Sequence, residues 1–142
     1  MIRNAVMSDL GALCALERSL FASDRLSRRA LRYHIRSRHA VMMCDVVNDR
    51  MRGYGLALRY ESQRAARLYS LAVDPDYHGQ GIAGGLIAAL EATCGKSVIR
   101  LEVRRDNNRA RAFYEKQGYV ATATRNDFYS DGEAAILMKK GL

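Results

Sequence analysis

The sequence predicts one α/β domain, with a mixed sheet of about seven strands and about four helices. Three observations support this class. Segments with the apolar pattern of short strands come before, between and after segments with helical spacing, in the order β-αα-βββ-α-β-α-ββ. The 142 residues suit one compact domain, which we expect to cover residues 1–142. One proline and eleven glycines leave little room for long linkers.

The N-terminal part is expected to form a strand followed by two helices. Residues 2–5 are the strand candidate. Ser8 and Ser27 have the residue type that caps helix N-termini, so each is expected to begin a helix. In the second helix Leu31 and Ile35 are four residues apart and therefore lie on one apolar face.

Six arginines fall between Arg25 and Arg38, in a chain whose formal net charge is +8. This segment is either an RNA-binding or partner-docking helix, or the solvated face of an amphipathic helix. We favour the solvated face because no aromatic platform is interleaved with the arginines, and direct nucleic-acid binding is not expected. A few of the chain's basic residues are expected to meet an anionic small ligand.

A three-stranded meander is expected next, followed by alternating helices and strands. The tripeptide Asn48-Asp49-Arg50 is a hairpin signal between the first two of these strands. Gly95 and Gly118 follow helical segments, at the position where glycine commonly ends a helix. The expected elements are strands 41–47, 51–59 and 66–73, helix 81–93, strand 97–103, helix 107–117, and strands 119–124 and 134–138.

Composition also limits the class of protein. Cys14, Cys44 and Cys94 lie far apart without a CxxC spacing, which predicts reduced, buried thiols of a cytoplasmic protein. The histidines are scattered, so no metal site is expected. Apolar stretches stay under ten residues, and the start of the chain lacks the apolar core of a signal peptide. We therefore expect a cytoplasmic protein with no membrane segment.

Three glycines stand in six residues between the last meander strand and the next helix. Glycines let the backbone approach a ligand closely, here at Gly79, Gly81 and Gly84, and the helix start offers unpaired N–H groups. Phosphate or pyrophosphate is therefore the expected ligand. A plain tight turn is the alternative. The spacing also satisfies the dinucleotide fingerprint, with Glu102 about 20 residues further on. We disfavour that fold because five residues separate the strand from the first glycine and only about 60 residues follow the turn.

The same segment resembles motif A of the GNAT superfamily of N-acetyltransferases, whose turn has the pattern Arg/Gln-x-x-Gly-x-Gly/Ala. The matching residues are His78-Gly79-Gln80-Gly81-Ile82-Ala83, with histidine where arginine or glutamine is usual. The resemblance implies that acetyl-CoA is the co-substrate and that its pyrophosphate lies on the amides of this turn. It also implies that the strand Leu71-Ala72-Val73 pairs with the pantetheine arm.

A second string, Leu101-Glu102-Val103-Arg104-x-x-Asn107-x-x-Ala110-x-x-Phe113-Tyr114-x-x-x-Gly118-Tyr119, resembles motif B of the same superfamily. The two motifs cover about residues 68–120, and together they imply the GNAT fold. The cofactor-binding residues that this resemblance implies are Leu71, Ala72, Val73, His78, Gly79, Gln80, Gly81, Ile82, Ala83, Gly84, Asn107 and Tyr114.

Glu102 and Tyr114 are the candidate catalytic residues. The resemblance places the helix with Tyr114 beside the cofactor's sulfur, where a protonated phenol can supply a proton to the departing thiolate. Glu102, at the end of a strand beside the expected cleft, is the candidate base, acting directly or through a water. The alternatives are a core aromatic for Tyr114, and for Glu102 a surface ion pair with Arg100 or Arg104. Asn107 either contacts the cofactor or caps the helix that follows it.

Within the superfamily the sequence is most similar to the bacterial ribosomal-protein-alanine N-acetyltransferases, the RimI type. The similar parts are the Leu-Glu-Val-Arg string and the segment Arg125-Asn126-Asp127-Phe128-Tyr129-Ser130-Asp131-Gly132. This resemblance implies acetyl transfer to a primary amine, in particular the N-terminal α-amine of a protein such as a ribosomal protein. An α-amine titrates at about 7.7–8.0 and lysine at about 10.4, so a modest base suffices. The alternatives are a lysine or small-molecule N-acetyltransferase of the same fold, a dinucleotide-binding module, and a nucleic-acid-binding or ribosome-binding module without turnover.

Overall fold

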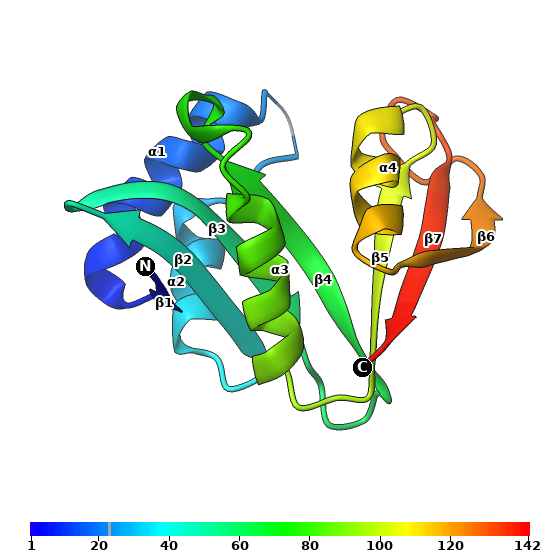
Figure 1. Cartoon of the computed structure of the whole chain (residues 1–142), viewed down its shortest axis with the longest axis horizontal. Coiled ribbons are helices and arrows are strands. Elements are labelled where there is room, and N and C mark those ends of the chain that lie inside the picture. The colour runs from blue at the N-terminus through cyan, green and yellow to red at the C-terminus, as the bar shows by residue number, and fades with distance from the viewer. Residues whose placement is uncertain (23) are drawn as a thin grey trace.

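The computed structural model describes residues 1–22 and 24–142. The strands are β1 (Ile2–Asn4), β2 (Ala40–Val47), β3 (Arg50–Leu58), β4 (Ala65–Val73), β5 (Val98–Arg104), β6 (Val120–Arg125) and β7 (Ala135–Gly141). The α-helices are α1 (Leu10–Leu20), α2 (Arg28–Arg36), α3 (Ile82–Thr93) and α4 (Asn108–Lys116). The strands form one mixed sheet in the order β1-β2-β3-β4-β5-β7-β6, with α1 and α2 on one face and α3 and α4 on the other (Figure 1). The predicted α/β class with seven strands and four helices is confirmed.

The first four strands pair antiparallel, as a meander requires. Asn48 and Asp49 form the turn between β2 and β3 and have φ angles of 51° and 62°. Asparagine and aspartate tolerate this left-handed conformation, which two-residue hairpin turns use. The hairpin prediction is confirmed, although Arg50 already belongs to β3.

Strands β4 and β5 run parallel but share a short ladder. Only the three pairs from Ala65 with Val98 to Arg67 with Arg100 are formed. Beyond them the two strands diverge toward their carboxyl ends, with α3 beside β4 and α4 beside β5 on the same face (Figure 1). Both the α3 N-terminus and the face of α4 therefore border the widening interval between the strands.

A bulge in β4 decides which side chains face α3 and α4. The pairing with β3 shifts between Leu68 and Ser70, so that Tyr69 is an extra residue. Because strand side chains alternate between faces, one extra residue reverses the alternation. Leu68, Leu71 and Val73 consequently all pack on the α3 side of the sheet, whereas Ala72 packs in the core under α1 and α2.

Local capping explains where the helices begin. Ser27 Oγ accepts the Ala30 N–H at 3.0 Å, which confirms the predicted cap of α2. The prediction for Ser8 is wrong, because a 3₁₀ turn over Met7–Asp9 precedes α1. Asp9 is the N-cap residue of α1, but its carboxylate accepts the Val6 N–H at 2.8 Å before the 3₁₀ turn and pairs with Arg3, and no side chain caps α1.

The cysteines agree with the sequence analysis, since Cys14, Cys44 and Cys94 are all free and buried. Within residues 1–22 and 24–142 no group of three or more His, Cys, Asp or Glu side chains is arranged to hold a metal ion. The helices of this described part are all too short or too polar to cross a membrane.

Candidate active site

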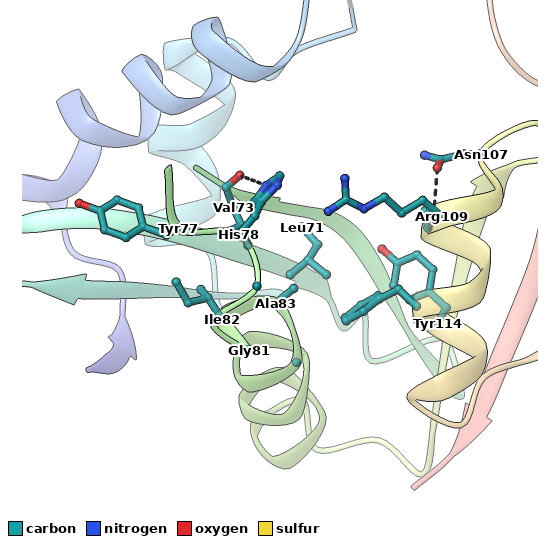
Figure 2. Close-up of a pocket in the computed structure, with 14 residues that line it drawn as sticks. Leu71, Val73, Tyr77, His78, Gly81, Ile82, Ala83, Asn107, Arg109 and Tyr114 are labelled. Carbon is teal, nitrogen blue, oxygen red and sulfur yellow. Dashed lines mark hydrogen bonds between the residues drawn. The ribbon is translucent and has the colours of Figure 1, made fainter. Parts of the chain in front are cut away.

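A cavity of about 490 Å³ opens where β4 and β5 diverge, between the start of α3 and the face of α4 (Figure 2). Its walls come from the end of β4, the glycine-rich turn and two helices. The lining residues are Leu71, Val73, Tyr77, His78, Gly79, Gly81, Ile82, Ala83, Gly84, Asn107, Arg109, Ala110, Phe113 and Tyr114.

The glycine-rich turn has the backbone geometry of an anion cradle. Gly79 and Gly81 have φ angles of 81° and 76°, which glycine adopts without strain. A Cβ built at either position would meet no atom within 4 Å, so neither glycine is required by packing against the protein. Gly81 is the N-cap of α3 and no side chain caps that helix, so its first amides keep their hydrogen-bonding capacity. The residues present therefore fit a phosphate group held by backbone N–H groups.

His78 ties this turn to the strand before it. Its Nε2 lies 3.1 Å from the carbonyl oxygen of Val73, and Figure 2 shows the ring turned back onto the end of β4. With Nε2 protonated, the ring donates to that carbonyl and holds the turn in place. The side chain of His78 thus supports the position of the turn.

The opposite wall is the first two turns of α4. Asn107 Oδ1 accepts the Ala110 N–H at 3.1 Å, so Asn107 caps this helix as one of the two sequence interpretations proposed. Arg109 extends from the helix across the cavity toward β4 and the glycine-rich turn (Figure 2). A guanidinium beside two helix N-termini gives this end of the cavity a positive character.

Tyr114 lies deeper in the same wall. Its ring makes edge contacts with Phe113 and Tyr119, at centroid distances of 5.3 and 5.8 Å. Among the described residues none hydrogen-bonds its hydroxyl, which is therefore free to meet a ligand in the cavity. Burial raises the pKa of Tyr114 to about 12, with a smaller contribution from Tyr129. The phenol is consequently protonated throughout the neutral range.

A second cavity, of about 460 Å³, lies on the other face of the sheet. Its lining residues are Glu17, Leu20, Phe21, Ala22, Asp24, Leu26, Tyr69, Ser70, Arg104 and Tyr129. The Arg104 guanidinium lies over the Tyr129 ring, 5.0 Å from its centroid. Burial and then the charge of Glu102 raise the pKa of Tyr129. Tyr129 lines this second cavity but not the first, and the two cavities lie on either side of β4, at Leu71 and Val73 for the first and at Tyr69 and Ser70 for the second.

Comparison with known proteins identifies the family. Residues 5–142 match the acetyltransferase (GNAT) domain family, which is nearly the whole chain. The chain belongs to the GNAT family. An uncharacterized N-acetyltransferase of Methanocaldococcus jannaschii is 32% identical over 146 aligned positions, covering 99% of this chain and 90% of that protein. The [ribosomal protein bS18]-alanine N-acetyltransferase of Escherichia coli is 39% identical over 79 positions, covering 51% of this chain and 53% of that enzyme.

Solved structures share this GNAT fold over its full length. The crystal structure of the ribosomal-protein-S18-alanine N-acetyltransferase from Escherichia coli superposes with a TM-score of 0.86 at 26% identity, covering 99% of this chain and 92% of that chain. Arabidopsis thaliana NAA60, solved in complex with acetyl-CoA, superposes with a TM-score of 0.85 at 18% identity, covering 100% and 98% of the two chains. The predicted GNAT fold, the acetyltransferase class and acetyl-CoA as co-substrate agree with these findings.

Most of the cofactor residues implied by the sequence border the first cavity of this GNAT domain. Ten of the twelve line it. The two exceptions are Ala72, which packs under α1 and α2, and Gln80, whose Oε1 accepts a hydrogen bond from Arg52 Nη1 at 3.4 Å. The contacts that the resemblance implies for Ala72 and Gln80 are made by their backbone, so the positions of these two side chains do not decide them. Four further residues line this cavity that the sequence did not place among the cofactor-binding residues: Tyr77, Arg109, Ala110 and Phe113.

Glu102 lies outside both cavities. Its carboxylate accepts hydrogen bonds from Arg67 Nε at 3.0 Å and Arg100 Nη1 at 3.1 Å, and its side chain is 9% exposed. The expected ion pair with Arg100 is present, whereas the one with Arg104 is not, because Arg104 pairs with Asp131 at 2.6 Å. Arg67 is a partner that the sequence did not indicate.

A buried hydrogen-bond network supports the wall of the second cavity. Glu17, 2% exposed, accepts the Leu26 N–H at 2.7 Å and the hydroxyl proton of Tyr54. The Tyr54 oxygen also lies 3.1 Å from Ser70 Oγ, at the bulge of β4. Burial, followed by the hydrogen bond to Glu17, raises the pKa of Tyr54. The network thus fastens the segment between α1 and α2 to the strand that separates the cavities.

Replacing Glu17 by alanine is expected to lower the free energy of unfolding by about 2–4 kcal/mol, because the part-buried Leu26 N–H loses its acceptor and the buried Tyr54 hydroxyl loses one partner. Glu17→Gln should recover most of the loss, since the amide oxygen still accepts the Leu26 N–H. Denaturant unfolding of both variants measures the effect, with Glu115→Ala as a control at an exposed carboxylate. An unchanged midpoint for Glu17→Ala would show that the network contributes nothing to stability.

Proposed function

We propose that this GNAT domain transfers the acetyl group of acetyl-CoA to the N-terminal α-amine of a protein, such as a ribosomal protein. The observation that carries the proposal is the pair of cavities on opposite faces of the sheet, both of them lined by β4 residues between Tyr69 and Val73. One cavity has the features of a phosphate cradle. The other is large enough for a peptide N-terminus and is lined by the loops that precede α2 and β7. The E. coli relative and structural neighbour, whose names describe an alanine N-acetyltransferase, support the α-amine.

The first cavity suits the pantetheine and pyrophosphate of acetyl-CoA. The amides at the start of α3 and the Arg109 guanidinium supply the positive end. Leu71, Val73 and Phe113 supply an apolar wall along the interval where β4 is no longer paired with β5. In this proposal the unpaired edge of β4 binds the pantetheine amides, and a backbone N–H near Val73 stabilises the oxyanion of the tetrahedral intermediate.

Each proton has a proposed route. The amine nitrogen forms a bond to the acetyl carbon, the carbon–sulfur bond breaks, and Tyr114 gives its hydroxyl proton to the departing sulfur. The amine attacks in its neutral form, and the proton that its nitrogen loses once the N–C bond has formed passes to Glu102 through a water, because Glu102 does not line either cavity. Arg67 and Arg100 hold that carboxylate in position. An α-amine needs only a modest base, since its pKa of about 7.7–8.0 leaves roughly a tenth of it neutral at pH 7, far more than for a lysine with a pKa of about 10.4.

The acceptor class is tested with one peptide that begins with alanine and contains a single internal lysine. Acetyl-CoA turnover is expected on this peptide and absent from the same peptide with a formylated α-amine. An aminoglycoside serves as the small-molecule amine, since some proteins of this fold are aminoglycoside N-acetyltransferases. Equal turnover of the formylated peptide, or faster turnover of the aminoglycoside, would contradict the proposal and support the lysine or small-molecule alternative.

We also propose that the protein works in the cytoplasm. Three free, buried thiols suit a reducing compartment, and ribosomal proteins are found there. Fractionation of cells that express the protein should place it with cytoplasmic markers.

A further inference from the structure

Helix α2 presents an unusual exposed face. Arg29, Arg32, Tyr33 and Arg36 follow one another at the spacing i, i+3, i+4, i+7, so they lie along one side of the helix. With Ser37 they line a surface hollow of about 410 Å³. The opposite side of α2 carries Leu31, which is fully buried against the sheet. The stripe of arginines therefore faces solvent.

The charge of this stripe is not balanced by the rest of the protein. Among the described residues, no carboxylate lies within ion-pair distance of Arg29, Arg32 or Arg36. Arginines of the sheet behave differently, since Arg52 and Arg67, for example, each pair with an acidic side chain at 2.7–3.0 Å. Exposed guanidinium groups without internal partners are available to phosphates, which they bind through two parallel hydrogen bonds.

The stripe also contains an exposed aromatic ring. Tyr33 is 58% exposed and stands between Arg29 and Arg36 on the same side of the helix. A tyrosine face offers a nucleobase a stacking platform, which the carboxylates of an acidic peptide do not use. The sequence was expected to disfavour nucleic acid because no aromatic is interleaved with the arginines. Tyr33 is such an aromatic, so that expectation is wrong for this surface.

We propose that the Arg29–Arg32–Tyr33–Arg36 surface of α2 binds single-stranded RNA. The three arginines contact phosphates and Tyr33 stacks on a base. The surface lies on the sheet face that carries α1 and α2, whereas the proposed acetyl-CoA cavity lies on the face of α3 and α4 (Figure 1). RNA and acetyl-CoA should therefore bind at the same time, and the RNA site does not depend on the identity of the amine acceptor.

Fluorescence anisotropy with a labelled, unstructured RNA oligonucleotide at several salt concentrations tests the surface. Each phosphate contact on a single strand contributes about −0.7 to the slope of the logarithm of the association constant against the logarithm of the salt concentration. Three contacts therefore predict a slope of about −2. The triple variant Arg29→Gln, Arg32→Gln, Arg36→Gln should lose most of that slope. Tyr33→Ala should weaken binding by about fivefold or more with the slope retained. The matched control Arg64→Gln, Lys116→Gln, Lys139→Gln removes the same charge from exposed positions elsewhere and should retain most of the affinity.

Circular dichroism establishes that each variant is folded, and peptide acetylation should be unchanged in the α2 triple variant. Three results would overturn the proposal. The control triple variant loses as much affinity as the α2 variant, which would make the binding a property of net charge. Saturating acetyl-CoA displaces the RNA, which would place it in the cradle of α3. A polyglutamate peptide binds α2 while the RNA does not, which would assign the surface to an acidic protein.

Discussion

Replacing Tyr114 by phenylalanine is expected to lower the single-turnover rate by about 10²–10⁴-fold, the usual contribution of a general acid. The ring would remain packed against Phe113 and Tyr119, so the fold and the acetyl-CoA affinity should change little. Because the pKa of Tyr114 is raised to about 12, wild-type enzyme keeps this proton at all pH values near neutrality. The ratio of the wild-type rate to the variant rate should therefore be constant from about pH 7 to 9.

Tyr119→Phe is the matched control for this experiment. The Tyr119 hydroxyl donates to Glu91 at 2.8 Å and does not line the cavity, so its removal should reduce stability by about 1 kcal/mol and leave the chemical rate intact. A folded Tyr114→Phe variant with the wild-type rate would assign Tyr114 to the core alone. In that case the departing thiolate would have to take its proton from water.

Replacing Gly81 by valine is expected to raise the dissociation constant of acetyl-CoA by about tenfold or more, equivalent to at least about 1.4 kcal/mol. The added side chain would project into space that is open in the protein, where the proposal places the pyrophosphate. Isothermal titration with acetyl-CoA measures the change directly.

Backbone strain must be separated from this effect, because valine is disfavoured at the φ angle of 76° found at Gly81. Gly95 provides the control, since it has a φ angle of 73°, is equally open, and lies at the other end of α3. Gly95→Val should cost similar stability and leave acetyl-CoA affinity unchanged. Equal acetyl-CoA affinities for the two variants and the wild type would show that the pyrophosphate does not bind at the glycine-rich turn.

Local sequence signals predicted most of the elements. Ser27, Gly95 and the Asn48-Asp49 turn act within a few residues of their own position, and each has its expected role. Ser8 shows the limit of such signals. A 3₁₀ turn precedes α1 there, and Arg3 on β1 holds the carboxylate of Asp9 in that turn, a contact that the linear sequence does not reveal.

The features that create the site depend on pairing between distant segments. The three-pair ladder of β4 with β5 opens the cavity, and the extra residue Tyr69 turns Leu71 and Val73 toward it while Ala72 faces away. No local sequence pattern predicts the bulge at Tyr69. Arg67 is 35 residues from Glu102 in sequence, so its ion pair could not be anticipated either. Arg109 is different, since an arginine in the first turn of a helix beside a phosphate cradle is a signal that the sequence did contain.

The central claim is acetyl transfer to a protein N-terminal α-amine, and label localisation tests it most directly. The enzyme is incubated with isotope-labelled acetyl-CoA and the alanine-terminated peptide with one internal lysine, and the product is fragmented in a mass spectrometer. We expect the labelled acetyl group on the fragment that contains the α-amine, with the lysine side chain unmodified. Label found only on the lysine, or no labelled peptide from a protein that binds acetyl-CoA, would contradict it.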